Sequence, residues 1–232
     1  MSTTYSAKKT LPYKVELIRQ IKRRRTLISY VLMIALPLIV VAAVKFGPST
    51  SSSGDAGGNF GSGSANLIGL ATNGGFNFTV VMMLFGSGFL LTTVFALFSG
   101  DSVASEASWS TLRYLLASPV PRRRLLMIKL AVSLTLSFLA LFTLVIASYL
   151  IGVFAFGNAD LQSPLGGTYS GLDAWYRIAI ITFYIGITLL FTSGIAFLMS
   201  VRTDVPLGAV GTAVVIVIVS QILDAIEALG SI

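Results

Sequence analysis

Residues 130–156 read LAVSLTLSFLALFTLVIASYLIGVFAF and contain no Asp, Glu, Lys or Arg. About 20 apolar residues in an α-helix cross the hydrocarbon core of a bilayer, so this run is long enough to span it. The alternative is a buried core helix of a large soluble protein, which a single run does not exclude. The composition of the remaining chain decides between the two.

Four further runs of the same kind lie on either side, at residues 27–44, 78–98, 178–199 and 205–223. Apolar residues make up 55% of the 232 residues and charged residues 11%, less than half of the usual proportion of about a quarter. A soluble domain of this length could not bury so much apolar surface. The sequence therefore predicts an all-α integral membrane protein, with about five transmembrane helices in a single transmembrane domain, 1–232.

The basic residues are distributed unevenly between the runs. Eight precede the first run, five lie between the second and third, and Arg202 lies between the fourth and fifth, which together make 14 of the 16. Only Lys45 and Arg177 lie in the alternate connections. By the positive-inside rule, this distribution predicts a cytoplasmic N-terminus. The net charge of +7 is therefore interpreted as membrane topology and attraction to anionic lipid, and not as nucleic-acid binding.

Catalytic and metal-binding residue types are scarce. The chain has no Cys and no His, and its apolar runs hold no acid. These absences remove the commonest general base and the thiolate nucleophile, so we expect that the chain is not an enzyme by itself and holds neither cofactor nor metal. The first outer connection, 46–77, is rich in Gly and Ser and is expected to be flexible with little packed structure. It is not a phosphate-binding loop, because no Gly-Lys-Ser/Thr follows.

Residues 10–26 are predicted to form a helix that lies on the inner membrane surface. Its apolar side chains fall within an arc of about 160° at ~100° per residue, Thr10 can cap it, and Pro12 is tolerated in its first turn. The alternative is a basic retention signal with no folded role. The predicted membrane-surface residues are Leu11, Val15, Ile18, Arg23, Arg24 and Arg25.

Residues 101–118 belong to a cytoplasmic connection that is much longer than a helical hairpin needs. Its composition favours a helix from about Ser102 to Ala117, which Asp101 could cap and Pro119 could end. Such a helix, with an exposed acid and aromatic side chain, could seat in a partner. Alternatively, Glu106 and Arg113 are solvated loop charges and Trp109 is an interfacial anchor.

The same connection holds, in order, Glu106, Thr111, Leu115-Leu116, Pro119, Arg122-Arg123-Arg124 and Lys129. This order resembles the permease subunits of ABC-2 type transporters, which carry an acid, a Gly-Thr pair, a Leu-rich turn, a Pro, an Arg-rich start to the third span and a Lys. Ser110 stands where the family usually has Gly, a change that a helix tolerates. Residues 10–26 resemble the elbow helix of that family. The family usually has six spans, so a sixth is expected beyond the last run; the alternative is a five-span variant.

The resemblance implies that residues 101–118 are a coupling helix that docks on a cytoplasmic ATPase. The implied ATPase interface is Glu106, Trp109, Thr111, Arg113 and Pro119. The implied partners are two copies of the ATPase, which would bind ATP and magnesium, and a second permease subunit, the same or homologous. This chain itself has no Walker A motif.

The sequence thus predicts an exporter subunit of a prokaryotic cytoplasmic membrane. Spans without charges disfavour ion-coupled transport and suit an amphipathic, lipidic or hydrophobic substrate. Candidate pathway residues are Thr92, Thr93, Thr188 and Thr192, although most hydroxyls in spans bond to their own helix. The alternative function is a non-transporting membrane scaffold or assembly factor.

Overall fold

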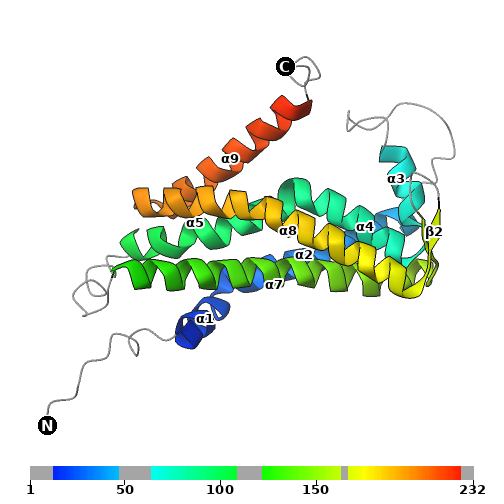
Figure 1. Ribbon diagram of the computed structural model, residues 1–232, viewed down its shortest axis with the longest axis horizontal. Helices are drawn as coiled ribbons and strands as arrows, with labels where there is room; N and C mark the ends of the chain where they lie inside the picture. The colour runs from blue at the N-terminus through cyan, green and yellow to red at the C-terminus, as the bar shows by residue number, and fades with distance from the viewer. Residues whose placement is uncertain (1–12, 47–63, 109–121, 163–166, 226–232) are drawn as a thin grey trace, which may run out of the picture. The chain divides into compact units, whose positions relative to one another are not determined.

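The computed structural model describes residues 13–46, 64–108, 122–162 and 167–225 (Figure 1). Within these ranges it has seven helices, if the continuous helical stretch Gly75–Ser108 is counted as one, and a single pair of two-residue strands. The predicted all-α class is confirmed. Residues 163–166 and the segments at both ends of the chain lie outside this description.

Five helices among the described residues are long and apolar enough to cross a membrane, as predicted. They are Arg24–Phe46, Gly75–Ser108, Arg123–Phe156, Gly171–Arg202 and Pro206–Leu223. Four of them extend beyond the apolar run that predicted them, because charged residues at their ends continue the helix. These extensions bring Asp101, Glu106 and Lys129 into the long apolar helices.

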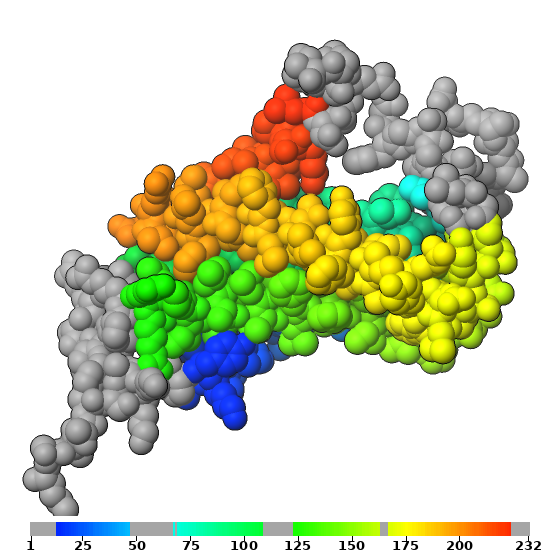
Figure 2. Space-filling view, in the orientation of Figure 1, coloured from blue at the N-terminus to red at the C-terminus, as the bar shows by residue number. Residues whose placement is uncertain are grey.

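The chain divides into two compact units, which are described separately. Unit 1 comprises residues 1–29, 89–140 and 186–232. Its described parts are α1 (Tyr13–Ile21), the start of α2 (Arg24–Phe46), α5 (Thr92–Ser108), the first half of α7 (Arg122–Phe156), the second half of α8 (Gly171–Arg202) and α9 (Pro206–Ala225). Figure 2 shows the side chains of α1, in blue, directly against those of α7, in green.

Small residues let the helices of unit 1 approach closely. Ala96 on α5, Ala196 on α8 and Ala213 on α9 form one buried cluster. A Cβ atom at Gly100 would lie 2.9 Å from Cγ2 of Val210 on α9. In a membrane, where lipid is as apolar as Leu, such close contact is a main source of helix association.

Unit 2 comprises residues 30–88 and 141–185. It contains the rest of α2, α3 (Ser64–Ala71), α4 (Gly75–Gly86), and the strands β1 (Leu161–Gln162) and β2 (Thr168–Tyr169), which pair antiparallel. The π-helical stretch η1 (Ser87–Leu91) follows α4. The core of unit 2 forms around Phe78, Val81 and Met82 of α4.

Gly74 and Gly75, which we call the glycine corner, let α4 pack against the end of α7 in unit 2. A Cβ atom at Gly75 would lie 2.5 Å from Cγ2 of Val153 and 3.0 Å from its backbone nitrogen. Gly74, with φ of 152°, has a conformation that favours glycine, and its added Cβ would lie 2.8 Å from Cβ of Ala159. No larger residue fits at this corner without displacing the backbone.

Two sequence predictions need correction here. The first concerns residues 46–77, which were expected to have little packed structure. Residues 64–71 form α3, and its Leu67, Leu70 and Ala71 pack on the core of unit 2. The Gly- and Ser-rich composition of the connection hid this short apolar segment, whereas residues 47–63 lie outside the described ranges.

The second correction concerns the predicted helix over 10–26. Helix α1 ends at Ile21, and α2 begins at Arg24. The hydroxyl of Thr26 donates a hydrogen bond to the carbonyl oxygen of Gln20 at 2.7 Å, and the N–H of Arg23 donates to the same oxygen at 3.2 Å. These bonds hold a tight turn between the two helices, so Arg24 and Arg25 belong to the first span. Thr10 and Leu11 lie outside the described residues.

Candidate functional site

A buried cluster of charged side chains joins α1, α5 and α7 within unit 1. It contains three carboxylates, those of Glu16, Asp101 and Glu106, and four cations, those of Arg19, Arg23, Arg25 and Lys129. We call these seven residues the charge cluster. They come from segments far apart in the sequence, so the fold creates the cluster.

Lys129 is the centre of one half of the charge cluster. Its side chain is 1% exposed, and its Nζ lies 2.6 Å from Oε1 of Glu106 and 3.7 Å from Oε1 of Glu16. The ammonium group also donates a hydrogen bond of 3.1 Å to the carbonyl oxygen of Ser102. One Lys therefore links three helices, since Glu16 is on α1 and Glu106 and Ser102 are on α5.

Arg19 lies on the exposed side of this half of the charge cluster and pairs with both of its carboxylates. Its guanidinium group lies 2.9 Å from the carboxylate of Glu16, and it also pairs with Glu106. The side chain of Arg19 is 45% exposed, whereas both carboxylates are buried. Gln20, one turn after Glu16 on α1, donates to Oε1 of Glu16 at 3.1 Å. The polar face of α1 thus points into the protein.

Asp101 is the centre of the other half. It pairs with Arg25, and its Oδ2 accepts a hydrogen bond of 3.3 Å from Nη1 of Arg23. The same Arg23 nitrogen donates to Oγ of Ser105 at 3.4 Å. Arg23 lies in the turn between α1 and α2, and Arg25 lies in the first turn of α2. Asp101 therefore fixes the position at which the chain enters its first span.

The electrostatic environment keeps the α1 part of the charge cluster ionised. Burial tends to raise the pKa of Glu16, but the positive charges of Lys129 and Arg19 outweigh it and lower this pKa below its ordinary value. Burial tends to lower the pKa of Arg19, and the carboxylates of Glu16 and Glu106 outweigh it and raise this pKa. Burial and the neighbouring Arg25 lower the pKa of Arg23, against the pull of Asp101. Glu16 and Arg19 thus stabilise each other in the charged form.

The placement of Glu106 and Asp101 corrects part of the predicted coupling helix. Asp101 was expected to cap a separate helix, but it lies inside α5, which runs without a break from Thr92 to Ser108. Glu106 was expected to be exposed, and it is only 4% exposed. The cause is the compensation of both carboxylates by basic partners, which lets α5 carry them into a packed setting. Trp109, Thr111, Arg113 and Pro119 lie outside the described residues.

The predicted membrane-surface residues are divided between two faces. Val15 and Ile18 are 60% and 52% exposed, on the side of α1 that faces away from the charge cluster. Arg23 and Arg25 bind Asp101, whereas Arg24 is exposed at the start of α2. Helix α1 thus has an apolar outer face and a polar face that packs on the protein. This arrangement is expected of a helix that lies between a membrane surface and the rest of the protein.

The four candidate pathway threonines differ in exposure. Thr92 and Thr192 are buried, Thr93 is half-buried, and Thr188 is exposed. Unit 1 also contains four buried hydroxyl groups that have no hydrogen-bond partner among the described residues: Thr93, Ser99, Ser137 and Ser193. Of these four, only Thr93 belongs to the four candidate pathway threonines, and the sequence offers no signal that separates the others from hydroxyls bonded to their own helix.

Glu16 and Arg19 were not predicted as site residues, and Lys129 was predicted only as part of a family pattern. A usable signal was present: Glu16, Arg19 and Gln20 lie at i, i+3 and i+4, opposite the apolar side chains of α1. A polar face on a helix expected at a membrane surface indicates a protein partner for that face. Among the described residues, no group of His, Cys, Asp and Glu could hold a metal ion.

The lengths and the hydropathy of the described helices define a multi-pass membrane protein. The chain belongs to the DUF2705 family, described as proteins of unknown function, whose model matches residues 64–228. Asp101, Glu106 and Lys129 fall inside the matched range, whereas α1 precedes it. No curated protein and no solved structure matches the chain.

Proposed function

We propose that this chain is a permease subunit of an ABC-2 type transporter. In this proposal it forms a membrane pathway for ATP-driven export, energised by two copies of a separate ATPase subunit and completed by a second permease subunit. The observation that carries the proposal is the charge cluster. It ties α1 to the last turn of α5, which lies within residues 101–118, where the resemblance puts the coupling helix.

The charge cluster can transmit a displacement of α5 to the helices α1 and α7. Glu106 lies two residues before the end of α5 and contacts Arg19 of α1 and Lys129 of α7. Separating buried ion partners leaves an uncompensated charge, which costs about 3–5 kcal/mol. A displacement of the end of α5 would therefore move α1 and the start of α7 with it, as a rigid body.

In this proposal Glu106 has a positioning role. A carboxylate that is 4% exposed and held by Lys129 is better placed to orient the segment after α5 than to contact another subunit. The contact itself is proposed for Trp109, Thr111, Arg113 and Pro119. The substrate would be amphipathic, lipidic or hydrophobic. This is supported by the four buried hydroxyl groups of unit 1 that have no partner among the described residues, since they could offer polar groups along a mainly apolar path.

The proposal requires a cytoplasmic N-terminus in a prokaryotic cytoplasmic membrane, and single cysteines test this orientation. The chain is naturally free of Cys, and Asn158 and Asp204 are both exposed and lie in connections expected on opposite sides. We expect an impermeant maleimide to label Asn158→Cys in intact cells and Asp204→Cys only after lysis. The reverse pattern would exclude a cytoplasmic docking segment.

The ATPase partnership is tested by affinity purification of the tagged chain from cross-linked native membranes. We expect a protein with a Walker A motif to co-purify in a comparable amount, and Glu106→Gln to lower this amount or the ATP hydrolysis of the complex. Asp204→Asn removes an exposed acid elsewhere and should change neither. A chain that recovers no nucleotide-binding protein would support the scaffold function instead.

A further inference from the structure

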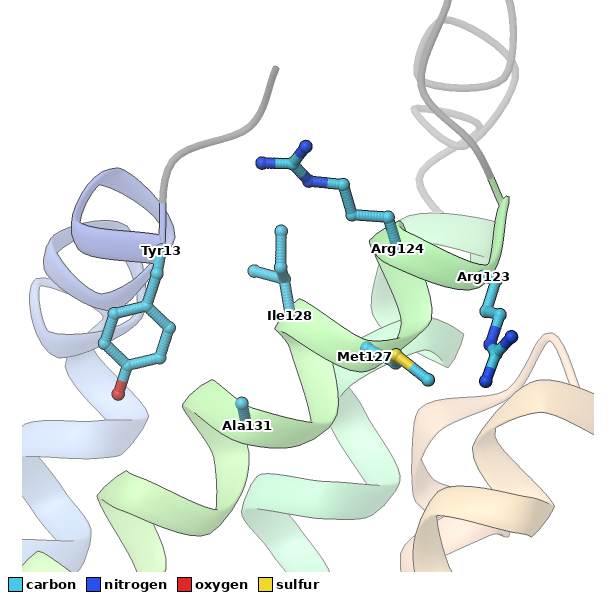
Figure 3. Close-up of a pocket in the computed structure, with 6 residues that line it drawn as sticks. All are labelled: Tyr13, Arg123, Arg124, Met127, Ile128 and Ala131. Atoms are coloured by element: carbon cyan, nitrogen blue, oxygen red, sulfur yellow. The ribbon is translucent and has the colours of Figure 1, made fainter. Parts of the chain in front are cut away.

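A second feature of unit 1 is a groove of about 460 Å³ between the start of α1 and the first turns of α7. It is open on one side and lined by Tyr13, Arg123, Arg124, Met127, Ile128 and Ala131. Figure 3 shows Tyr13 on α1 facing α7, and Arg124 extending over Ile128 on the α1 side. Arg123 leaves α7 on the side away from Tyr13.

The lining is arranged in layers along α7. The two arginines occupy the first turn of the helix, and Met127, Ile128 and Ala131 occupy the next two. Residues 124, 128 and 131 share one face at i, i+4 and i+7 and extend over about 10 Å. One turn further on, the hydroxyl of Tyr13 donates a hydrogen bond of 2.8 Å to Oγ1 of Thr135, which ties the α1 wall to α7.

The groove lies where an apolar span begins. The candidate span on α7 runs from Arg123 to Phe156, so the basic layer lies at the first residues of this helix and the apolar layer one to two turns further along it. The neighbouring α1 exposes Val15 and Ile18, as a helix on a membrane surface would. An occupant must therefore offer negative charge at the start of α7 and hydrocarbon further along it.

Arg123 of the groove differs from the arginines of the charge cluster in its partners. Arg19, Arg23 and Arg25 are compensated by carboxylates of the protein. Arg123 is exposed and makes no ion pair with any residue that the structure describes. A guanidinium group presents several N–H donors in a plane that matches phosphate oxygens.

We infer that this groove is a binding site for an anionic phospholipid of the leaflet at the start of α7. The phosphate is held at the first turn of α7, with Arg124 on the Tyr13 side and Arg123 on the other side, and an acyl chain lies along Met127, Ile128, Ala131 and the ring of Tyr13. The lipid contacts both α1 and α7, so it supports the attachment of α1 that the charge cluster provides. This inference does not depend on the transporter proposal.

Native mass spectrometry of the purified chain with equal amounts of phosphatidylglycerol and phosphatidylcholine tests the inference. The wild-type chain should retain phosphatidylglycerol preferentially. The double variant R123Q/R124Q should lose up to about thirtyfold of this preference, equivalent to about 2 kcal/mol for two basic residues near a membrane surface. The control R202Q removes an exposed basic residue at the end of α8 and should keep the preference.

A second variant leaves both arginines in place. Ala131→Phe fills the apolar layer and should reduce the total amount of retained phosphatidylglycerol, with unchanged elution as a folded species. Millimolar inorganic phosphate should not displace the lipid. Equal retention of the two lipids by the wild-type chain, an equal loss in R202Q, or displacement by free phosphate would each overturn the inference.

Discussion

Unit 1 is held at one end by ionised side chains, whereas unit 2 is held by aromatic rings and close backbone contacts. Unit 1 buries Lys129 and three carboxylates at one junction of helices. In unit 2, the rings of Phe76, Tyr149 and Trp175 contact one another with centroids 4.7–5.7 Å apart. Among its described residues, unit 2 buries no ionised side chain.

The polar groups that unit 2 does bury are neutral and satisfied. The amide of Asn77 donates to the carbonyl oxygen of Asp160 at 3.1 Å and accepts from the N–H of Gln162 at 2.8 Å. Thr79 and Thr182 each donate to a carbonyl oxygen one turn earlier in their own helices. The two units therefore differ in what can break them: loss of one charge leaves another uncompensated in unit 1, and added volume displaces the backbone in unit 2.

The largest expected effect is that of Lys129→Met. The substitution leaves Glu16 and Glu106 buried without their shared ammonium group, which should cost about 3–5 kcal/mol of folding stability. Thermal unfolding in detergent, followed by size-exclusion fluorescence, measures it. Lys45→Met, at the exposed end of α2, is the matched control and should change little.

A double-mutant cycle sharpens this prediction. Glu106→Gln combined with Lys129→Met removes a charge of each sign, so the pair should cost less than the sum of the single variants. Strict additivity would mean that the ion pair of 2.6 Å contributes nothing to stability.

The next effect concerns the glycine corner of unit 2. Gly75→Val should destabilise by at least about 1–3 kcal/mol, because its side chain would meet Val153 and the backbone of α7. The cost should be the same at pH 5 and pH 8, since no ionised group is involved. Gly69→Ala, where an added Cβ meets nothing within 4 Å, is the control. A strong pH dependence of the Gly75→Val effect would contradict the distinction between the units.

A smaller effect is expected from acid. The pKa of Glu16 lies below its ordinary value of 4.5, so its stabilisation is present above about pH 4.5 and is lost as the pH falls through the lowered value. Lys129, Arg19, Gln20 and Glu106 surround this part of the cluster. Glu16→Gln should cost about 1 kcal/mol at pH 7 and lose less stability than the wild-type chain on acidification. Parallel melting curves from pH 7 to pH 3.5 measure this difference, and identical slopes would refute it.

The smallest effect is expected at the contact between Arg177 and the ring of Tyr169, where a charged side chain of unit 2 takes part. The guanidinium carbon of Arg177 lies 3.5 Å from the ring centroid of Tyr169, and Arg177 is exposed. Tyr169→Leu should cost about 0.5–1 kcal/mol, the usual value of an exposed cation–π contact. Tyr176→Leu removes an exposed ring from the same helix as Arg177 and serves as the control. A loss as large as that of Lys129→Met would remove the contrast between the units.

The five spans were predictable because each depends only on the length of an apolar run. The apolar face of α1 was predictable from its periodicity, but the turn at Lys22-Arg23 was not, because it depends on Asp101, far along the chain. For the same reason the run that predicted the second span ended at Phe98, although α5 continues to Ser108. A charge normally ends an apolar run, and only the fold reveals that distant partners compensate it. Packing of α3 was missed because its core contacts lie on α4.

The central place of Lys129 in the charge cluster has a consequence for how the protein is made. Glu16 and Glu106 both leave the ribosome before Lys129, since synthesis runs from the N-terminus. Until the start of α7 is synthesised, the nascent chain carries two carboxylates that lack their common ammonium partner. The junction of α1, α5 and α7 therefore cannot close during insertion of the first two spans. This junction can close only after the third span, α7, has begun to be synthesised.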